Sequence, residues 1–221
     1  DNIQEKPELR VAHRTSPTNI GLALLANLAA RDFGYITEGQ LIERTAATLD
    51  AMDKLERYHG HFLNWYDTRT LQPLRPAYVS SVDSGNLAGH LLTLRAGLIL
   101  LAQEPPCFSR LRHGLADTLE LVRNTTADKP PEGLSRFSAL LDHAFLTEDA
   151  AQPEIQALAD LHECALQIHA QVVQALPPGH EAGQWTGALV RQCAAAKDEV
   201  SPLTALSLHT EGQTHLQNRR H

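Results

Sequence analysis

The chain has 221 residues, of which 43% are hydrophobic and 20% charged, and its net charge is −7. This is the composition of a globular protein that is long enough to bury a core. The acidic balance and the lack of a basic run argue against a nucleic-acid-binding surface. No apolar run reaches the roughly 18 residues that cross a bilayer, and three scattered cysteines are expected to be free thiols in a reducing compartment.

Apolar residues recur with helical spacing through almost the whole chain, which predicts an all-α protein. Ser16 before Pro17 is a favourable helix start, and Gly34 supplies a stop. The segment after Asp83 is apolar nearly all round, so we expect that helix to be buried on most sides. Helices are expected from Ser16-Pro17 to Phe33-Gly34, from near Thr37, from Asp83 or Ser84 to about Gln103, from about Phe108 to Arg123, and at about 133–147, 153–176 and 182–198.

The stretch between the second and third helices, His59–Asn86, is the most informative part of the chain. It is long and polar, and it holds two tyrosines, one tryptophan and two aspartates. Aromatic faces beside carboxylates and amides suit sugar rings, which present C–H faces for stacking and hydroxyls for hydrogen bonding. A loop of this kind within a helical chain is usually functional or disordered, and its bulky aromatics argue against disorder. We therefore interpret it as part of a carbohydrate site.

Several of these residues also have a purely structural interpretation. Asp83 can act only as the N-cap of its helix or can also contact sugar. Asp67 can cap a turn, or it can pair with Arg69 or Arg75. Trp65 can stack on a sugar or pack in the core.

Residues outside the aromatic set complete the candidate site. Arg14 can hydrogen-bond a sugar or brace the loop by pairing with an aspartate, and His61 is either a contact or a surface residue. The start Ser16-Pro17-Thr18-Asn19-Ile20 parallels Asp83-Ser84-Gly85-Asn86-Leu87, which places Asn19 and Asn86 near unpaired backbone N–H groups at one common face. The candidate substrate-binding residues are Arg14, Asn19, His61, Asn64, Trp65, Tyr66, Asp67, Tyr78, Asp83 and Asn86.

No metal or cofactor site is expected. His162 and His169 share a helix face but lie two turns apart, whereas metal-binding pairs are usually three or four residues apart. The chain has no glycine-rich phosphate loop, because Gly85 and Gly89 stand alone.

Two stretches carry a family resemblance. VAHRTSPTNIGLALLANLAARDFGYIT (Val11–Thr37) and GHFLNWYDTRTLQPLRPAYVSSVDSGNLAG (Gly60–Gly89) resemble cyclic β-1,2-glucan synthases, very large inner-membrane enzymes of bacteria. The resemblance is to the region between the membrane-embedded glycosyltransferase module and the glycoside phosphorylase-like module, and it continues more weakly to Leu206. Tyr78 is a departure, because related glucanase-like proteins tend to carry Glu there, and this leans toward a synthase-type site.

The resemblance implies a fold and a function. The fold would be helical hairpins forming part of an (α/α)6-type toroid over residues 1–206, followed by a polar, flexible tail at 207–221. The function would be transglycosylation that closes linear β-1,2-glucan into rings. A retaining transfer needs two carboxyl groups roughly 5 Å apart, and the family's candidate glutamates are expected downstream, so no catalytic residue is assigned here.

The resemblance also implies partners and a location. The partners would be a β-1,2-glucan chain and the remaining modules of the parent synthase, without nucleic acid and without a cofactor. The chain begins with Asp1 and is expected to be a soluble piece, on the cytoplasmic side, of an inner-membrane protein. The alternative is a non-catalytic helical module that binds glucan or acts as a scaffold, and a scaffold predicts a buried Trp65. Half a toroid should expose an apolar face and self-associate.

Overall fold

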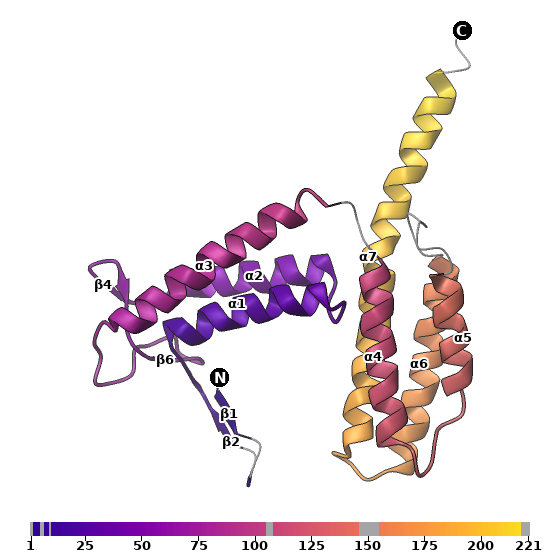
Figure 1. Ribbon diagram of the computed structural model, residues 1–221, viewed down its shortest axis with the longest axis horizontal. Helices are drawn as coiled ribbons and strands as arrows, with labels where there is room; N and C mark the ends of the chain where they lie inside the picture. The colour runs from indigo at the N-terminus through magenta and orange to yellow at the C-terminus, as the bar shows by residue number, and fades with distance from the viewer. Residues whose placement is uncertain (1, 5–6, 9, 105–107, 146–154, 218–221) are drawn as a thin grey trace. The chain divides into compact units, whose positions relative to one another are not determined.

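The computed structural model describes residues 2–4, 7–8, 10–104, 108–145 and 155–217, with side chains as far as residue 200. The chain divides into two compact units. Unit 1 comprises residues 1–30 and 41–104, and unit 2 comprises residues 31–40 and 105–221. The described residues form seven helices and six strands of two or three residues (Figure 1). The expected all-α class is confirmed, and the toroid stays a prediction.

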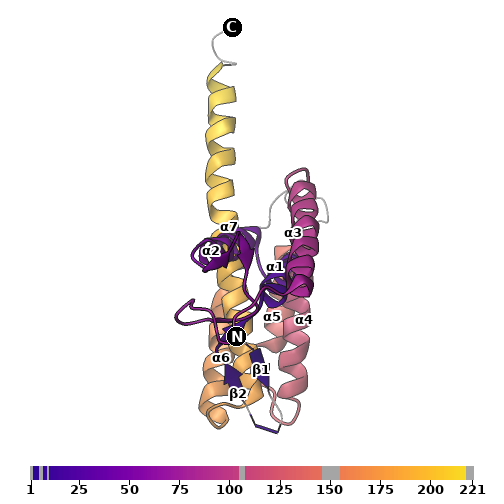
Figure 2. The ribbon, with the colours of Figure 1, turned by 90° about the vertical axis from the view of Figure 1, so that its left-hand side faces the viewer.

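Unit 1 is built on three helices and three small antiparallel strand pairs. Figure 1 shows the helices running alongside one another, and Figure 2 views the first two nearly end-on and the third obliquely. The helices are α1 (Pro17–Asp32), α2 (Glu38–Asp53) and α3 (Ser81–Leu101). The strand pairs are β1 (Asn2–Gln4) with β2 (Arg10–Ala12), β3 (Arg14–Thr15) with β6 (Tyr66–Asp67), and β4 (Arg57–Tyr58) with β5 (His61–Phe62).

Helix α3 begins earlier than the sequence predicts. Ser80 is its N-cap, with an extended backbone, and its hydroxyl accepts the N–H of Asp83 at 3.2 Å. Ser16 does the same for the N–H of Asn19 at 3.3 Å before α1. The equivalent positions are therefore Asn19 and Asp83, and Asn86 lies one turn further along. The predicted cap at Asp83 is wrong, because a serine three residues upstream already satisfies this orphan N–H.

Two glycines let α1 and α3 approach each other closely. A Cβ on Gly21 would collide with the imidazole of His90, and a Cβ on Gly97 would collide with Leu28. The core of unit 1 then forms between the helices and the loop that follows α2. Its buried members are Ile20, Leu24, Met52, Leu55, Leu63, Tyr66, Leu87 and Leu94.

The expectation that the third helix is buried on most sides is wrong. In α3, Leu87 and Leu94 are buried, whereas Leu92 is 69% exposed and Leu100 is 61% exposed. The sequence is apolar all round, so its pattern cannot say which face meets a neighbour. In the structure, only the side toward α1 and the loop is covered.

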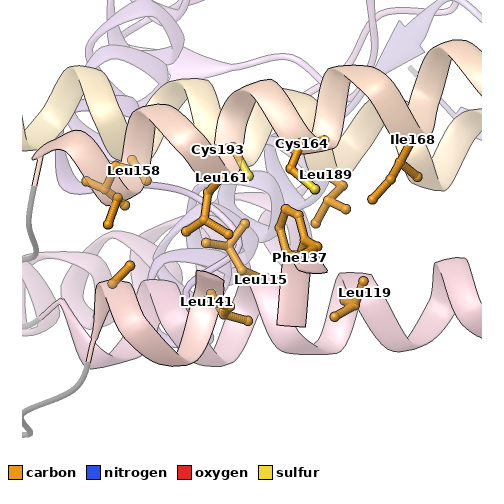
Figure 3. Close-up of a cluster of buried hydrophobic side chains, with 14 of the residues drawn as sticks. Leu115, Leu119, Phe137, Leu141, Leu158, Leu161, Cys164, Ile168, Leu189 and Cys193 are labelled. Atoms are coloured by element: carbon orange, nitrogen blue, oxygen red, sulfur yellow. The ribbon is translucent and has the colours of Figure 1, made fainter. Parts of the chain in front are cut away.

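Unit 2 is a bundle of four helices. They are α4 (Ser109–Thr125), α5 (Leu134–Ala144), α6 (Ile155–Ala175) and α7 (Glu181–Gln217). Helix α6 packs against α5 and α7. Helix α4 also packs against α5 and α7. Figure 3 shows Phe137 of α5 in the centre of the core, near Leu115, Leu161 and Leu189 from the other three helices.

Helix α7 is longer than the sequence predicts, since it continues past residue 198 to Gln217. The proposed polar tail begins within this helical span, and residues 218–221 lie outside the described residues. The domain boundary at residue 206 stays a prediction.

The buried cysteines of unit 2 are free thiols. Cys164 and Cys193 make no disulfide, and Cys107 lies outside the described residues. Burial raises the pKa of Cys164, and it raises the pKa of Cys193 to about 12. These thiols therefore stay protonated and act as small apolar core groups. Within the described part of the chain, no helix combines the length and the apolar character needed to cross a membrane.

Candidate functional site

The predicted site loop is supported from inside by Tyr66. This side chain is fully buried, and its hydroxyl donates to the carbonyl of Glu56 at 2.7 Å while accepting the N–H of Leu63 at 2.7 Å. A buried ring whose hydroxyl already has two backbone partners offers no surface to a ligand. We therefore correct its assignment from a sugar contact to a support of the loop.

Asn64 clamps the two ends of the same loop. Its side-chain oxygen accepts the N–H of Tyr78 at 3.1 Å, and its amide group donates to the carbonyl of Pro76 at 3.3 Å. Its own backbone N–H donates to the carbonyl of Tyr78 at 2.9 Å. Asn64 is buried and so also has a structural role, whereas the ring of Tyr78 remains 56% exposed.

Arg14 and Trp65 form the aromatic part of the site. Strand β3 pairs with β6, so that Arg14 lies opposite Asp67 and Thr15 opposite Tyr66. The Arg14 guanidinium lies 5.0 Å from the centroid of the Trp65 ring, which is a cation–π contact. Trp65 is half-buried, so it is neither a core residue nor a fully exposed platform.

Asp67 organises the turn that follows β6. One carboxylate oxygen accepts the N–H groups of Arg69 at 2.9 Å and Thr70 at 3.0 Å, and the other pairs with the Arg69 guanidinium at 3.2 Å. These bonds, the Arg69 side chain first, lower the pKa of Asp67 to about 2. Of the partners considered, the structure selects Arg69, and Asp67 is ionised at neutral pH.

A polar cluster joins the first turns of α1 and α3. Thr18 donates its hydroxyl hydrogen to Asp83 at 2.7 Å, and the Asn86 amide donates to the Thr18 hydroxyl oxygen at 3.1 Å. The Asn19 amide donates to the side-chain oxygen of Asn2 at 3.0 Å. Thr18 therefore links the starts of α1 and α3 within unit 1, and the common face of a toroid stays a prediction. The sequence did not predict Thr18 as a site residue, although Thr18 lies between Ser16 and Asn19, which are equivalent to Ser80 and Asp83.

Opposing effects set the charge of Asp83. Burial raises its pKa, but hydrogen bonds from Thr18, Ser80 and Ser16 together outweigh burial and lower the pKa. The carboxylate is therefore ionised at neutral pH, beside two helix N-termini that favour negative charge.

The loop and the polar cluster are continuous along the chain. Arg14 stands two residues before the cap of α1, and Tyr78 two residues before the cap of α3. The β3–β6 pairing therefore brings Trp65 and Asp67 beside the start of α1. His61 lies instead in the β4–β5 hairpin, opposite Tyr58.

The chemistry of this arrangement favours binding over acid catalysis. A retaining transfer at sugars needs one carboxylic acid that is protonated at the working pH. Both Asp67 and Asp83 have a lowered pKa, so neither suits that role. Among the described residues, no group of three His, Cys, Asp or Glu side chains lies close enough to hold a metal ion. The site therefore offers aromatic ring faces, amides and hydrogen-bond acceptor oxygens for binding.

Comparison with known proteins decides what this segment resembles. No protein-family model matches the chain. It is 34% identical over 213 aligned residues to the cyclic beta-(1,2)-glucan synthase NdvB of Rhizobium meliloti (strain 1021), an alignment that covers 88% of the chain. The chain is similar to part of a cyclic β-1,2-glucan synthase. This confirms the resemblance carried by Val11–Thr37 and Gly60–Gly89. The chain spans only 8% of the length of that synthase.

In this synthase-like segment, the predicted residues divide into two groups. Asn64 and Tyr66 are buried and hold the loop in place. The others retain exposed or half-exposed side chains: Arg14, Asn19, His61, Trp65, Asp67, Tyr78, Asp83 and Asn86. Of these, Trp65, Asp67 and Tyr78 lie on the loop, and His61 lies in its β4–β5 hairpin. Asn19, Asp83 and Asn86 lie in the first two turns of α1 and α3, and Arg14 lies on β3.

Proposed function

We propose that the chain is part of a cyclic β-1,2-glucan synthase and that unit 1 binds the glucan chain during ring closure by transglycosylation. The observation that carries the proposal is the 34% identity to the Rhizobium synthase across most of the chain. The site of unit 1 supports it, because Arg14, Trp65 and Asp67 combine an aromatic face with groups that hydrogen-bond hydroxyls.

Each group in unit 1 has a specific part in binding. The accessible face of Trp65 stacks on the C–H face of a glucose ring, and Arg14 fixes the orientation of the indole. The carboxylates of Asp67 and Asp83 accept hydrogen bonds from sugar hydroxyls at the lone pairs that their protein partners leave free. Because both carboxylates are already held by neighbours, they are preorganised and lose little conformational freedom on binding.

The catalytic carboxyl pair is proposed to come from elsewhere in the parent. Neither Asp67 nor Asp83 suits the acid role of a retaining transfer, because the pKa of each is lowered. In the proposal, this chain contributes part of the glucan-binding wall of a toroid. The remaining modules of the synthase are then its partners, and it reaches the inner membrane only through them, on the cytoplasmic side.

The alternative is a non-catalytic glucan-binding or scaffolding module of the same parent. The specific observation in its favour is the uncovered apolar face of α3, where Leu92 and Leu100 are exposed. Such a face fits a contact with another module, whatever the loop binds.

Tryptophan fluorescence tests glucan binding directly, because the chain has only Trp65 and Trp185. In a Trp185→Phe variant, linear β-1,2-gluco-oligosaccharides should change the Trp65 emission in a saturable way, and β-1,4-linked oligomers should not. The matched Trp65→Phe variant, which keeps Trp185 in unit 2, should not respond. A flat titration at millimolar sugar in the Trp185→Phe variant would count against the loop site.

Product analysis in the parent synthase separates ring closure from scaffolding. Arg14→Ala combined with Trp65→Phe should lower the ratio of cyclic to linear glucan while chain elongation continues. If both products fall together with their ratio unchanged, the scaffolding alternative is favoured.

A further inference from the structure

Unit 2 carries two exposed aromatic rings that the loop site does not use. Phe33 is 63% exposed and Tyr35 is 41% exposed. Their ring centroids lie 6.0 Å apart, and the ring planes are tilted by 33°. Both rings stand on the short connection between α1 and α2. We call this pair the Phe33–Tyr35 platform.

The platform is held rigidly on α4. Gly34 between the two rings has φ of +76°, and a Cβ there would collide with the carbonyl of Arg110. Gly114 of α4 is equally tight, since its own Cβ would meet the backbone of Gly34. This backbone-to-backbone approach requires glycine at both positions. It fixes the connection while leaving the neighbouring rings in solvent.

A capping box fixes the other end of the connection. The N–H of Thr37 donates to the Gln40 side-chain oxygen at 3.2 Å, and the N–H of Gln40 donates to the Thr37 hydroxyl oxygen at 3.2 Å. This reciprocal pair starts α2. The rings are therefore presented by a connection that is anchored on both sides.

Carboxylates lie on the same connection as the rings and at the Tyr35 hydroxyl. The Tyr35 hydroxyl donates to Asp117 of α4 at 3.1 Å. Asp32 and Glu38 pair with the buried Arg31, and their side chains are 55% and 45% exposed. Charged residues are depleted at the core of protein–protein interfaces, whereas a carboxylate near aromatic rings suits a ligand that donates hydroxyl hydrogens.

We propose that the Phe33–Tyr35 platform is a second contact site for the glucan, separate from the loop of unit 1. Glucose rings stack on Phe33 and Tyr35, and their hydroxyls donate to the free acceptor positions of Asp117. The inference takes its ligand from the proposed function. Because every glucose ring of the polymer offers the same C–H faces and hydroxyls, the same ligand suits both sites.

Electrophoresis of the whole chain in native gels containing linear β-1,2-glucan tests the platform. Phe33→Ala combined with Tyr35→Ala should weaken retardation by about three- to tenfold in apparent affinity, the size expected for lost aromatic stacking. The loss should persist when the loop site is already impaired by Trp65→Phe. Tyr35→Phe keeps the ring and removes the Asp117 bond, and it should retain most of the retardation.

Tyr58→Ala is the matched control, because Tyr58 is 61% exposed and lies outside both sites. Its retardation should equal that of the unaltered chain. The platform is overturned if the double alanine variant behaves like this control, or if the unaltered chain is not retarded. Retardation that depends on Trp65 alone would contradict the platform and support the loop site. Retardation that depends on Phe33 and Tyr35 alone would support the platform and contradict the loop site. An effect on sedimentation without glucan would assign the rings to a protein contact instead.

Discussion

The two units of this protein achieve their structures by different means. In the described part of unit 2, seventeen buried residues from the connection before α4 and from the four helices form one apolar core around Phe137. The buried cluster of unit 1 has eight members. The conformation of unit 1 depends to a large extent on polar contacts as well. Tyr66, Asn64 and Asp67 hold its loop through hydrogen bonds to backbone groups.

The difference matters for function. A packed apolar bundle tolerates changes in the polar residues that cover it. In unit 1, the groups that hold the loop are of the same chemical kind as those that bind sugar. Its candidate site therefore depends on specific hydrogen bonds, which single substitutions can remove. Because Trp65 reports on unit 1 and Trp185 on unit 2, the two units can be compared within one chain.

The largest effect is expected from Phe137→Ala, which empties the centre of unit 2. The loss of a fully buried ring should lower the free energy of unfolding by about 3–5 kcal/mol. Urea unfolding followed by Trp185 fluorescence in a Trp65→Phe background measures this loss in the free energy of unfolding. The Trp65 signal of the complementary Trp185→Phe background should keep its midpoint. An equal shift of both signals would show that the units unfold together and would contradict the comparison.

Removal of one oxygen from Tyr66 should have a smaller effect, of about 1–3 kcal/mol. Tyr66→Phe leaves the carbonyl of Glu56 and the N–H of Leu63 without their partner in a buried setting. Urea unfolding followed by Trp65 should show the loss. Tyr58→Phe removes a hydroxyl from an exposed ring and should change nothing measurable. Equal stability of the Tyr66→Phe and Tyr58→Phe variants in urea would contradict the supporting role of the Tyr66 hydroxyl.

The exposed apolar face of α3 should make the isolated chain self-associate. Leu92→Ser combined with Leu100→Ser should shift sedimentation-velocity profiles toward the monomer, because each substitution removes apolar area from the surface. Leu166→Ser on α6, at a leucine that is 46% exposed, is the control in unit 2. Unaltered chain that stays monomeric at high concentration would contradict this prediction.

The smallest effect is a pH dependence from Asp67. Its folded-state pKa of about 2 lies below the ordinary value of 3.8, so folding favours the ionised carboxylate. Its contribution is complete above the ordinary pKa and is lost as the pH falls through about 2. The unfolding midpoint of the Trp65 signal should therefore differ between the unaltered residue and Asp67→Asn at about pH 5, and the difference should shrink at about pH 2.5. A difference that grows on acidification would contradict the assignment.

Much of unit 2 was predictable from its sequence. Helix α6 was expected at about 153–176 and spans Ile155–Ala175, since Leu158, Leu161, Ala165 and Ile168 repeat with helical spacing and fill one core. Periodicity succeeds here because the buried face of each helix is chemically distinct from its exposed face. Helix α3 lacks that contrast, so its sequence predicted a helix but misjudged its burial.

The loop of unit 1 shows where sequence reasoning stopped. Its sequence identified the right segment, the aromatic and acidic residues, and the resemblance that the Rhizobium comparison confirmed. It could not separate Trp65 and Tyr66, which are neighbours of similar chemistry. The pairing of β3 with β6 decided between them, because it fixes which side of the loop faces the core. Tyr66 therefore faces the core and Trp65 meets Arg14.

The sequence by itself determined the helices, the family resemblance and the composition of the candidate site, since these follow from local propensity and residue type. Only the tertiary structure decided which residue caps α3, that Thr18 links Asp83 to Asn86, and that Gly34 and Gly114 meet beneath the Phe33–Tyr35 platform. The Thr18 bonds and the meeting of the two glycines join residues 65 to 80 positions apart. The physical reason is that such pairs form only when packing brings distant segments together, and local sequence carries no record of that choice.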